Sequence, residues 1–301
     1  MKISKTIIGL ATTLAFGTLL VGCGTSKTSN SNGNDKINVV ASVDFYGEAA
    51  EAVLGNHGTV TSIINNPDVD PHDYEPTSAV GKKVAKADVA IENGAGYDSW
   101  MSKLVKGSGS TIKTVSAARV VGVEDGENEH IWYKPQTMPK MANALAKKFG
   151  KIDAKHKATY KENAKKYIDS LNPLLSLIDK LKANTEGKKV AVSEPVFVNA
   201  LNYLGYKVSD EHFAESVEES TDPTSEDIKN LEDDIANNKI AFFVQNTQVE
   251  SKVVDNIVKK CEDAGIPILK VTETLPAGKT YTEWMTDQYT ALEKIQDSES
   301  K

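Results

Sequence analysis

Short apolar segments alternate with segments of helical periodicity along the first half of the chain. The apolar segments are 37–43, 59–64, 87–91 and 111–115, and the helical patterns are 45–54, 77–85 and 98–105. Short buried strands separated by helices are typical of a parallel sheet with helices on both faces. The pattern therefore predicts an α/β lobe.

A long helical stripe follows this lobe. After a helix predicted for 139–149, apolar residues recur every three or four positions from 153 to 183, which predicts one long helix. Pro173 should kink it, because proline lacks the donor for one helical hydrogen bond. The alternation then returns, with strands at 189–193, 240–245 and 266–271 and helices at 196–204, 225–236, 251–264 and 280–292.

These segments together predict the fold class. We expect an α/β protein of two lobes, each with a mostly parallel sheet flanked by helices, joined by one long rigid helix. The predicted first lobe is 36–150, the linking helix is 151–186 and the second lobe is 187–301.

The N-terminal residues have the composition of a targeting signal. Two lysines precede an uncharged apolar stretch at 6–20, which is short for a membrane-spanning helix. A Leu-Val-Gly-Cys run that ends at Cys23 resembles the lipobox of bacterial lipoproteins. We expect a signal peptide at 1–22, a lipid on Cys23, and a flexible tether at 23–35, where no large apolar side chain occurs.

Composition narrows the possible partners. The formal net charge is −7, which argues against nucleic acid or an anionic lipid surface as the main partner and is compatible with a cationic ligand. Besides Cys23 the chain has one cysteine, Cys261, in a helical pattern, so we expect a buried thiol and no intramolecular disulfide.

The five histidines stand in different surroundings. His57 lies in a turn composition, His156 lies among lysines on the predicted long helix, and His212 lies in a polar segment predicted as a loop; all three are expected at the surface. His72 lies in a proline-bracketed loop that leaves a strand, which is where open α/β sheets bind ligands. His130 precedes an Ile-Trp-Tyr run, but spacing alone does not bring it to His72.

Several motifs resemble one family of metal receptors. The most specific is the Asp-Pro-His-Asp-Tyr-Glu-Pro run at 70–76, and further matches follow in the family's order at 86–89, 93–100, 130–132, 193–197 and 275–281. Together they are similar to the zinc/manganese (TroA-like, cluster A-I) substrate-binding lipoproteins of ABC importers. This resemblance extends from residue 39 to the last predicted helix.

The resemblance implies a single divalent metal ion bound between two lobes that a rigid helix joins. It places the ligands at His72, His130, Glu194 and Glu273, with Glu283 or Asp287 as substitutes for the fourth. Two carboxylates would neutralise a dication, and imidazole with carboxylate suits Mn²⁺ or Zn²⁺.

Two departures from the family's pattern bear on the metal. The stretch at 124–129 is acidic, where many zinc receptors carry a histidine-rich loop, which favours manganese slightly over zinc. The family commonly reads Leu-Asp-Pro where this sequence has Tyr133-Lys134-Pro135, so an acid that usually supports the second ligand is missing.

The resulting hypothesis is a monomeric receptor, not an enzyme, lipid-anchored on the extracellular face of the bacterial cell membrane. It would pass Mn²⁺ or Zn²⁺ to an ABC permease driven by a cytoplasmic ATPase, since the chain has no phosphate-binding loop of its own. A lipid-anchored metallohydrolase is the first alternative, but no HExxH or nucleophile motif occurs. A siderophore or haem receptor is the second, although such a pocket favours arginines and the chain has only Arg119.

Overall fold

The computed structural model describes residues 36–109, 111–185 and 187–299. The predicted signal peptide at 1–22, the lipid on Cys23 and the tether at 23–35 lie outside the described residues. The described residues belong to the compact unit from Asp35 to Lys301.

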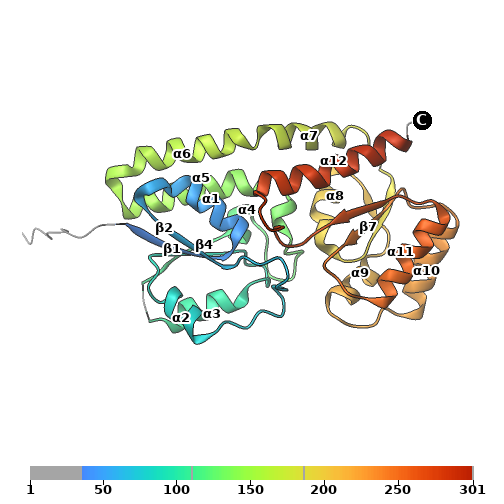
Figure 1. The fold of residues 1–301 in the computed structure, drawn as a ribbon, viewed down its shortest axis with the longest axis horizontal. Coiled ribbons are helices and arrows are strands. Elements are labelled where there is room, and N and C mark those ends of the chain that lie inside the picture. The colour runs from blue at the N-terminus through green and yellow to red at the C-terminus, as the bar shows by residue number, and fades with distance from the viewer. Residues whose placement is uncertain (1–35, 110, 186, 300–301) are drawn as a thin grey trace, which may run out of the picture. The chain divides into compact units, whose positions relative to one another are not determined.

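The first lobe is built on a parallel sheet with the strand order β2-β1-β3-β4. Its strands are β1 (Ile37–Val43), β2 (Gly58–Ile64), β3 (Val89–Glu92) and β4 (Lys113–Ser116). Its helices are α1 (Asp44–Leu54), α2 (Ser78–Val84), α3 (Ser99–Gly107), α4 (Ala117–Val121) and α5 (Thr137–Ile152), with short 3-10 turns η1 (Gly55–His57) and η2 (Ile131–Tyr133). Figure 1 shows α1 and α5 on one side of the sheet and α2 and α3 on the other, which confirms the predicted arrangement.

The second lobe repeats this topology with the order β6-β5-β7-β8, again all parallel. Its strands are β5 (Lys189–Val192), β6 (Lys207–Val208), β7 (Phe243–Asn246) and β8 (Ile268–Val271). Its helices are α8 (Val198–Leu204), α9 (Glu211–Glu218), α10 (Ser225–Ala236) and α11 (Lys252–Ala264), preceded by the 3-10 turn η4 (Pro195–Phe197).

Helix α9 corrects the prediction of a polar loop around His212. Phe213, Ala214 and Val217 face the interior and are buried, while the remaining positions of this eight-residue helix are mostly polar. Three apolar residues in two turns are too few to give a recognisable periodic pattern in the sequence. The helix is stabilised by packing in the second lobe, which only the structure shows.

The predicted linking helix is present and is interrupted near Pro173. It consists of α6 (Lys157–Ser170) and α7 (Asn172–Lys182), which follow one another after the 3-10 turn η3 (Ala154–His156). The interruption falls at Leu171, two residues before Pro173, which occupies the first turn of α7. Proline has no N–H to donate to the preceding turn, so a new helix begins there. Figure 1 shows α6 and α7 end to end, with the C-terminal helix α12 (Tyr281–Glu299) beside α7.

Aromatic side chains connect the C-terminal helix to the first lobe. The ring of Phe45 lies 5.1 Å from that of Trp132 and 5.7 Å from that of Trp284, measured between centroids. All three side chains are completely or almost completely buried. Cys261 is also fully buried, in a second apolar cluster, which confirms the predicted buried thiol.

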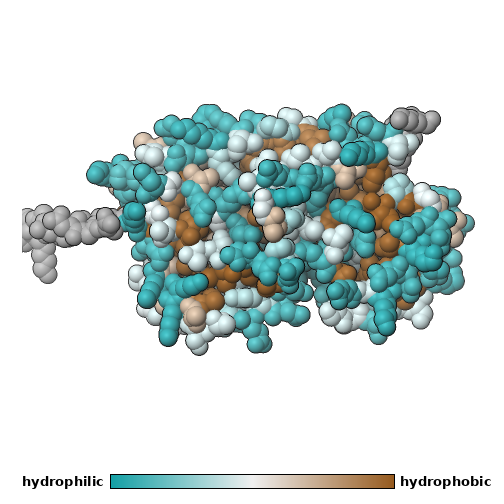
Figure 2. Space-filling model, viewed as in Figure 1, coloured by the Kyte–Doolittle hydropathy of each residue, from teal (hydrophilic) through white to brown (hydrophobic). Residues whose placement is uncertain are grey.

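The outer surface is largely hydrophilic. In the view of Figure 2, hydrophobic residues form smaller areas between polar ones. Among the described residues, Ile152 is the large hydrophobic residue that is exposed, with 41% of its surface accessible to solvent. None of the described helices is both long and apolar enough to cross a membrane.

The carboxyl ends of both sheets carry the loops that meet between the lobes. Direct hydrogen bonds join these loops: Tyr133 Oη donates to the carbonyl of Thr272 at 2.6 Å, and Gln248 Nε2 donates to the carbonyl of Pro67 at 2.7 Å. In open α/β sheets ligands bind at this edge, so the fold directs attention to these loops.

Candidate metal centre

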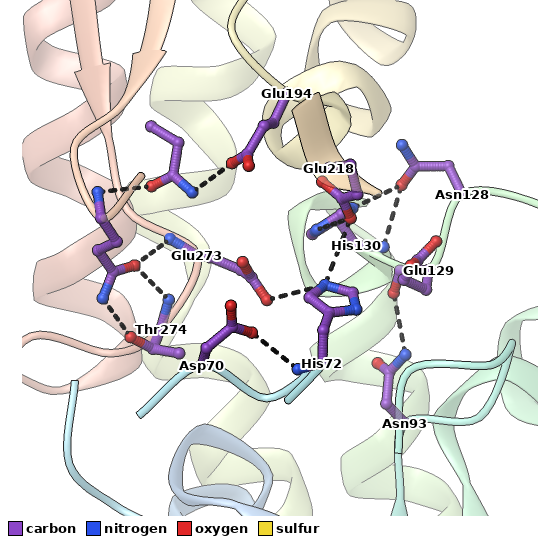
Figure 3. Close-up of polar contacts among 12 residues, drawn as sticks. Asp70, His72, Asn93, Asn128, Glu129, His130, Glu194, Glu218, Glu273 and Thr274 are labelled. Carbon is purple, nitrogen blue, oxygen red and sulfur yellow. Dashed lines mark hydrogen bonds and ion pairs between the residues drawn. The ribbon is translucent and has the colours of Figure 1, made fainter. Parts of the chain in front are cut away.

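The residues predicted as ligands come from loops of both lobes; three lie in loops that follow a strand, and His130 lies between α4 and η2. His72 lies in the loop after β2 and His130 lies directly before η2; Glu194 follows β5 and Glu273 follows β8. Figure 3 shows His72, His130 and Glu273 directed toward a common region, together with Glu218. Three of the four predicted residues are therefore brought together, and a carboxylate that was not predicted joins them.

His72 stands between two carboxylates of the second lobe. Its Nε2 atom lies 3.3 Å from Oε1 of Glu218 and 3.4 Å from Oε1 of Glu273. The backbone N–H of His72 donates to Oδ1 of Asp70 at 2.8 Å, which fixes the turn that presents the ring. Burial lowers the pKa of His72, but the two glutamates outweigh it and raise the pKa to about 11.

His130 is fully buried, and Asn128 determines its tautomer. Oδ1 of Asn128 accepts hydrogen bonds from the backbone N–H of His130 at 3.0 Å and from Nδ2 of Asn199 at 2.7 Å, while Nδ2 of Asn128 donates to the carbonyl of Pro195 at 2.8 Å. The amide orientation is thus fixed, and its oxygen lies 3.3 Å from Nδ1 of His130. Nδ1 is therefore the nitrogen that donates to Asn128, and Nε2 is the nitrogen that faces Glu218 and could bind a metal.

Asn128 takes the place of the acid that the family commonly has at the position of Lys134. The sequence predicted that an acid supporting the second ligand is missing, and the structure places an asparagine carbonyl on the outer nitrogen of that ligand instead. A neutral acceptor fixes the same tautomer, although it raises the basicity of the ring less than a carboxylate would.

Glu218 is the member of the site that sequence reasoning missed. It is the last residue of α9, and its Oε1 atom lies 3.4 Å from Nε2 of His130 as well as 3.3 Å from Nε2 of His72. Its side chain is 12% exposed. The one indication of this helix in the sequence is the spacing of Phe213, Ala214 and Val217, which is weak. A helix that buries these three residues places its C-terminal end near the loops of the site.

Glu194 lines the cleft but is engaged elsewhere. Its Oε2 atom accepts a hydrogen bond of 2.8 Å from Nδ2 of Asn246, and Figure 3 shows it apart from the imidazoles. Burial is the main influence on this group and raises the pKa of Glu194 to about 8, although the Asn246 hydrogen bond opposes it. Its role as a ligand stays a prediction.

A backbone hydrogen bond positions Glu273, and the neighbouring histidines favour its charged form. Its N–H donates to Oε1 of Gln248 at 2.7 Å. Burial would raise the pKa of Glu273, but contact with His72 and the nearby His130 lowers it below its ordinary value. The substitutes lie elsewhere: Glu283 accepts from the N–H of Thr280 and Asp287 pairs with Lys279, and neither lines the cleft.

Several polar atoms of the site are buried with incomplete compensation. Among the described residues, Nε2 of His130 is buried without a hydrogen-bond partner, and the Oε1 atoms of Glu218 and Glu273 share one imidazole, that of His72, at 3.3 and 3.4 Å. Two buried carboxylates beside one imidazolium leave a negative charge that a bound cation would balance. The donor set of imidazole nitrogen and carboxylate oxygen fits a divalent transition metal.

The cleft beside these atoms is strongly acidic. It has a volume of about 890 Å³, and its lining, among the described residues, contains no lysine or arginine. Seven carboxylates line it: Asp68, Asp70, Glu194, Glu218, Asp222, Glu250 and Glu273. A concave surface of one charge sign concentrates ions of the opposite sign, so the cleft attracts cations.

The remaining histidines differ from their predicted settings in part. His212 is exposed and lies 2.7 Å from Asp227, as expected for a surface residue. His57 was predicted to be solvated, but it is half-buried and its ring is stacked on that of His156 at 3.9 Å between centroids. The two residues are 99 positions apart, so their pairing depends on the packing of α1 against α5 and α6.

Two α/β lobes of the same topology, with imidazoles and carboxylates that could hold a metal ion where their sheet edges meet, are the architecture of a two-lobed binding protein. Residues 39–295 match the family described as zinc-uptake complex component A, periplasmic. The chain belongs to this family.

Two similar proteins align with most of the chain. It is 27% identical over 306 residues to the metal ABC transporter substrate-binding lipoprotein ScbA of Streptococcus cristatus, covering 94% of this chain and 95% of the relative. It is 24% identical over 268 residues to the manganese-binding lipoprotein MntA of Bacillus subtilis, covering 85% and 86%.

Solved structures support the fold. The periplasmic zinc binding protein TroA from Treponema pallidum superposes with a TM-score of 0.72 at 15% identity, covering 87% of this chain and 99% of that one. The Zn(II)-bound ZnuA-like domain of Streptococcus pneumoniae AdcA gives a TM-score of 0.68 at 20% identity, covering 87% and 99%. The two-lobed fold predicted from the sequence is thereby confirmed.

Proposed function

We propose that this protein is the substrate-binding lipoprotein of an ABC importer, which captures a divalent transition metal ion, Mn²⁺ or Zn²⁺, between its lobes. The observation that carries the proposal is the convergence of two imidazoles of the first lobe with buried carboxylates of the second, where ligand atoms of His72, His130 and Glu218 lie within 4.8 Å of one another. The names of the relatives support the same substrate class.

The proposed ligands are His72, His130, Glu194 and Glu273. His130 would bind through Nε2, because Nδ1 is occupied by Asn128, and His72 would exchange its proton for the metal. Glu194 would complete the set by leaving Asn246 and turning toward the imidazoles. Two carboxylates then balance the charge of a dication, so the filled site can be shielded from water.

The acidic cleft supports a bare cation over the alternative ligands. A siderophore or haem carries anionic groups, and the cleft would repel them, since its lining in the described part of the chain has seven carboxylates and no lysine or arginine. The single arginine, Arg119, pairs with Glu92 at 3.0 Å and does not line the cleft. A metallohydrolase would need a general base beside an open coordination position, and a ligand set contributed by both lobes suits enclosure of the ion.

The proposed setting follows from the N-terminal motif and the family. The protein would be a monomer anchored by a lipid on Cys23, on the extracellular face of the bacterial cell membrane, with 23–35 as a tether. The captured ion would pass to a membrane permease driven by a cytoplasmic ATPase. The lobes at 36–150 and 187–301 would hold the ion between them, with the segment 151–186 as the rigid connection.

Isothermal titration with Mn²⁺ and Zn²⁺ tests the site directly. We expect one tightly bound ion per chain at this site, and a decrease in affinity of at least 100-fold when His72 or His130 is replaced by alanine, because each supplies one of the two nitrogen ligands. His212→Ala is the matched control, since His212 also contacts a carboxylate but lies at the surface. Unchanged affinity in both His72→Ala and His130→Ala would refute the assignment.

A further inference from the structure

Glu218 has contacts that a structural carboxylate does not explain. Its Oε1 atom is buried and lies 3.3 Å from Nε2 of His72 and 3.4 Å from Nε2 of His130. His72 is shared with Glu273, whose Oε1 atom lies 3.4 Å from the same Nε2. Burial of two acids beside one shared imidazole costs free energy unless a further cation joins them.

The spacing of these atoms matches that of ligands around one ion. Two ligand atoms bound at about 2.1 Å and separated by about 100–110° at the metal lie about 3.2–3.4 Å apart. The distances from Glu218 Oε1 to the two imidazoles, and from Glu273 Oε1 to His72, are 3.3, 3.4 and 3.4 Å. Three side chains, those of His72, His130 and Glu218, therefore already have ligand atoms close to one another, and Glu273 lies beside His72.

We propose that Glu218 is itself a metal ligand, in addition to the residues named above; this rests on the proposed function. With Glu194 and Glu273 it gives three carboxylates and two imidazoles. Such an oxygen-rich set of five residues exceeds the four ligands of a tetrahedral zinc site and favours Mn²⁺, which is harder and takes more ligands. Glu218 thus biases the site toward manganese.

Glu218→Gln tests this, because it removes the charge and keeps the shape. We expect Mn²⁺ affinity to fall at least tenfold and Zn²⁺ affinity to fall less than threefold, and X-ray absorption of the manganese-loaded variant to show fewer oxygen neighbours. The control is Glu215→Gln, an exposed residue of the same helix. Thermal unfolding of the metal-free variants shows whether each is folded.

The possible outcomes distinguish failure of the proposed function from failure of Glu218 as a ligand. If the unmodified protein binds neither ion, the proposed function fails and this proposal fails with it. If it binds metal and Glu218→Gln binds Mn²⁺ as tightly, Glu218 is not a ligand. An equal loss for both ions would overturn the manganese preference while supporting ligation by Glu218.

A second cluster, independent of the cleft, has metal-binding chemistry of its own. His57 at the end of η1 and His156 at the end of η3 bring their rings to 3.9 Å between centroids, and Asp153 Oδ2 lies 2.5 Å from Nδ1 of His156. Candidate ligand atoms of the three residues all lie within 4.8 Å of one another. None of the three lines the cleft between the lobes.

The surroundings of this cluster resemble a partly organised site. Tyr160 Oη donates to Asp153 Oδ2 at 2.8 Å, which orients the carboxylate as an outer hydrogen bond does at many metal centres. All three residues are half-buried, so the rings are constrained while one side stays open to water. Two imidazoles, one carboxylate and a water would complete the tetrahedral coordination that Zn²⁺ prefers.

We infer that His57, Asp153 and His156 form a second, weaker zinc-binding site on the first lobe. The full chain with both His72→Ala and His130→Ala should still bind one Zn²⁺, and adding His57→Gln or His156→Gln should weaken that binding at least tenfold. Adding His212→Gln is the control, because His212 and Asp227 form a similar pair without a second imidazole.

A parallel measurement keeps the inference testable if the double variant does not fold. In the otherwise unmodified chain, saturating Zn²⁺ should give two ions per molecule, and His57→Gln should reduce this to one while leaving the tighter ion in place. A stoichiometry of one in the unmodified chain, or of two in His57→Gln, would overturn the second site.

Discussion

Replacing Asn128 with alanine removes the acceptor that fixes the ring of His130. The change deletes the contact with Nδ1 at 3.3 Å and the hydrogen bonds with the His130 N–H, Asn199 Nδ2 and the Pro195 carbonyl. Without an acceptor the ring can place its proton on Nε2 or rotate, and either change removes the lone pair from the metal. Loss of such an outer contact typically weakens metal binding roughly 10- to 100-fold, which is about 1.4–2.8 kcal/mol.

The assay compares metal affinity with folding stability. Competition titration of Mn²⁺ and Zn²⁺ gives the affinity, and urea unfolding without metal should show a loss of about 1–3 kcal/mol for the donors and acceptor left without partners. Asn128→Asp separates the two effects, because its carboxylate still accepts from Nδ1 of His130 but no longer donates to Pro195. We expect Asn128→Asp to retain metal affinity within about threefold. The reasoning is refuted if Asn128→Ala binds metal as tightly as the unmodified protein.

Two further predictions concern stability. Burial raises the pKa of Asp210 to about 8, so between pH 4 and 8 the folded state keeps a proton that the unfolded state releases, and stability should fall with rising pH by up to about 1.4 kcal/mol per unit. Asp210→Asn keeps the acceptor for the N–H of Val192 and should flatten this dependence in urea unfolding; an unchanged slope would contradict the assignment. Trp284→Ala should cost about 3–5 kcal/mol of unfolding free energy, because the side chain is 1% exposed and fills the contact between α12 and α1. Ile152→Ala, at an exposed site, should cost less than about 1 kcal/mol, and similar losses in both variants would show that burial is not the cause.

The elements that could be predicted are those whose signal is local. Most strands and helices of both lobes were predicted because an apolar run or a 3.6-residue repeat exists within each segment, whereas the short helix α4 and the two-residue strand β6 were not. The interruption near Pro173 follows from its missing donor. Helix α9 was missed because two turns with three apolar residues carry too little pattern. The error mattered, since α9 carries Glu218.

The fold class follows from the sequence alone, and the loop after a predicted strand points to His72. His130, Glu194 and Glu273 were predicted because the motifs around them resemble those of the metal-receptor family. Which side chains come together depends on the tertiary structure: it added Glu218, held Glu194 on Asn246, and paired His57 with His156. Periodicity is a property of neighbours along the chain, whereas a binding site consists of atoms from distant segments. Their positions to within an ångström depend on how the helices and sheets pack, and that information is spread over the whole core.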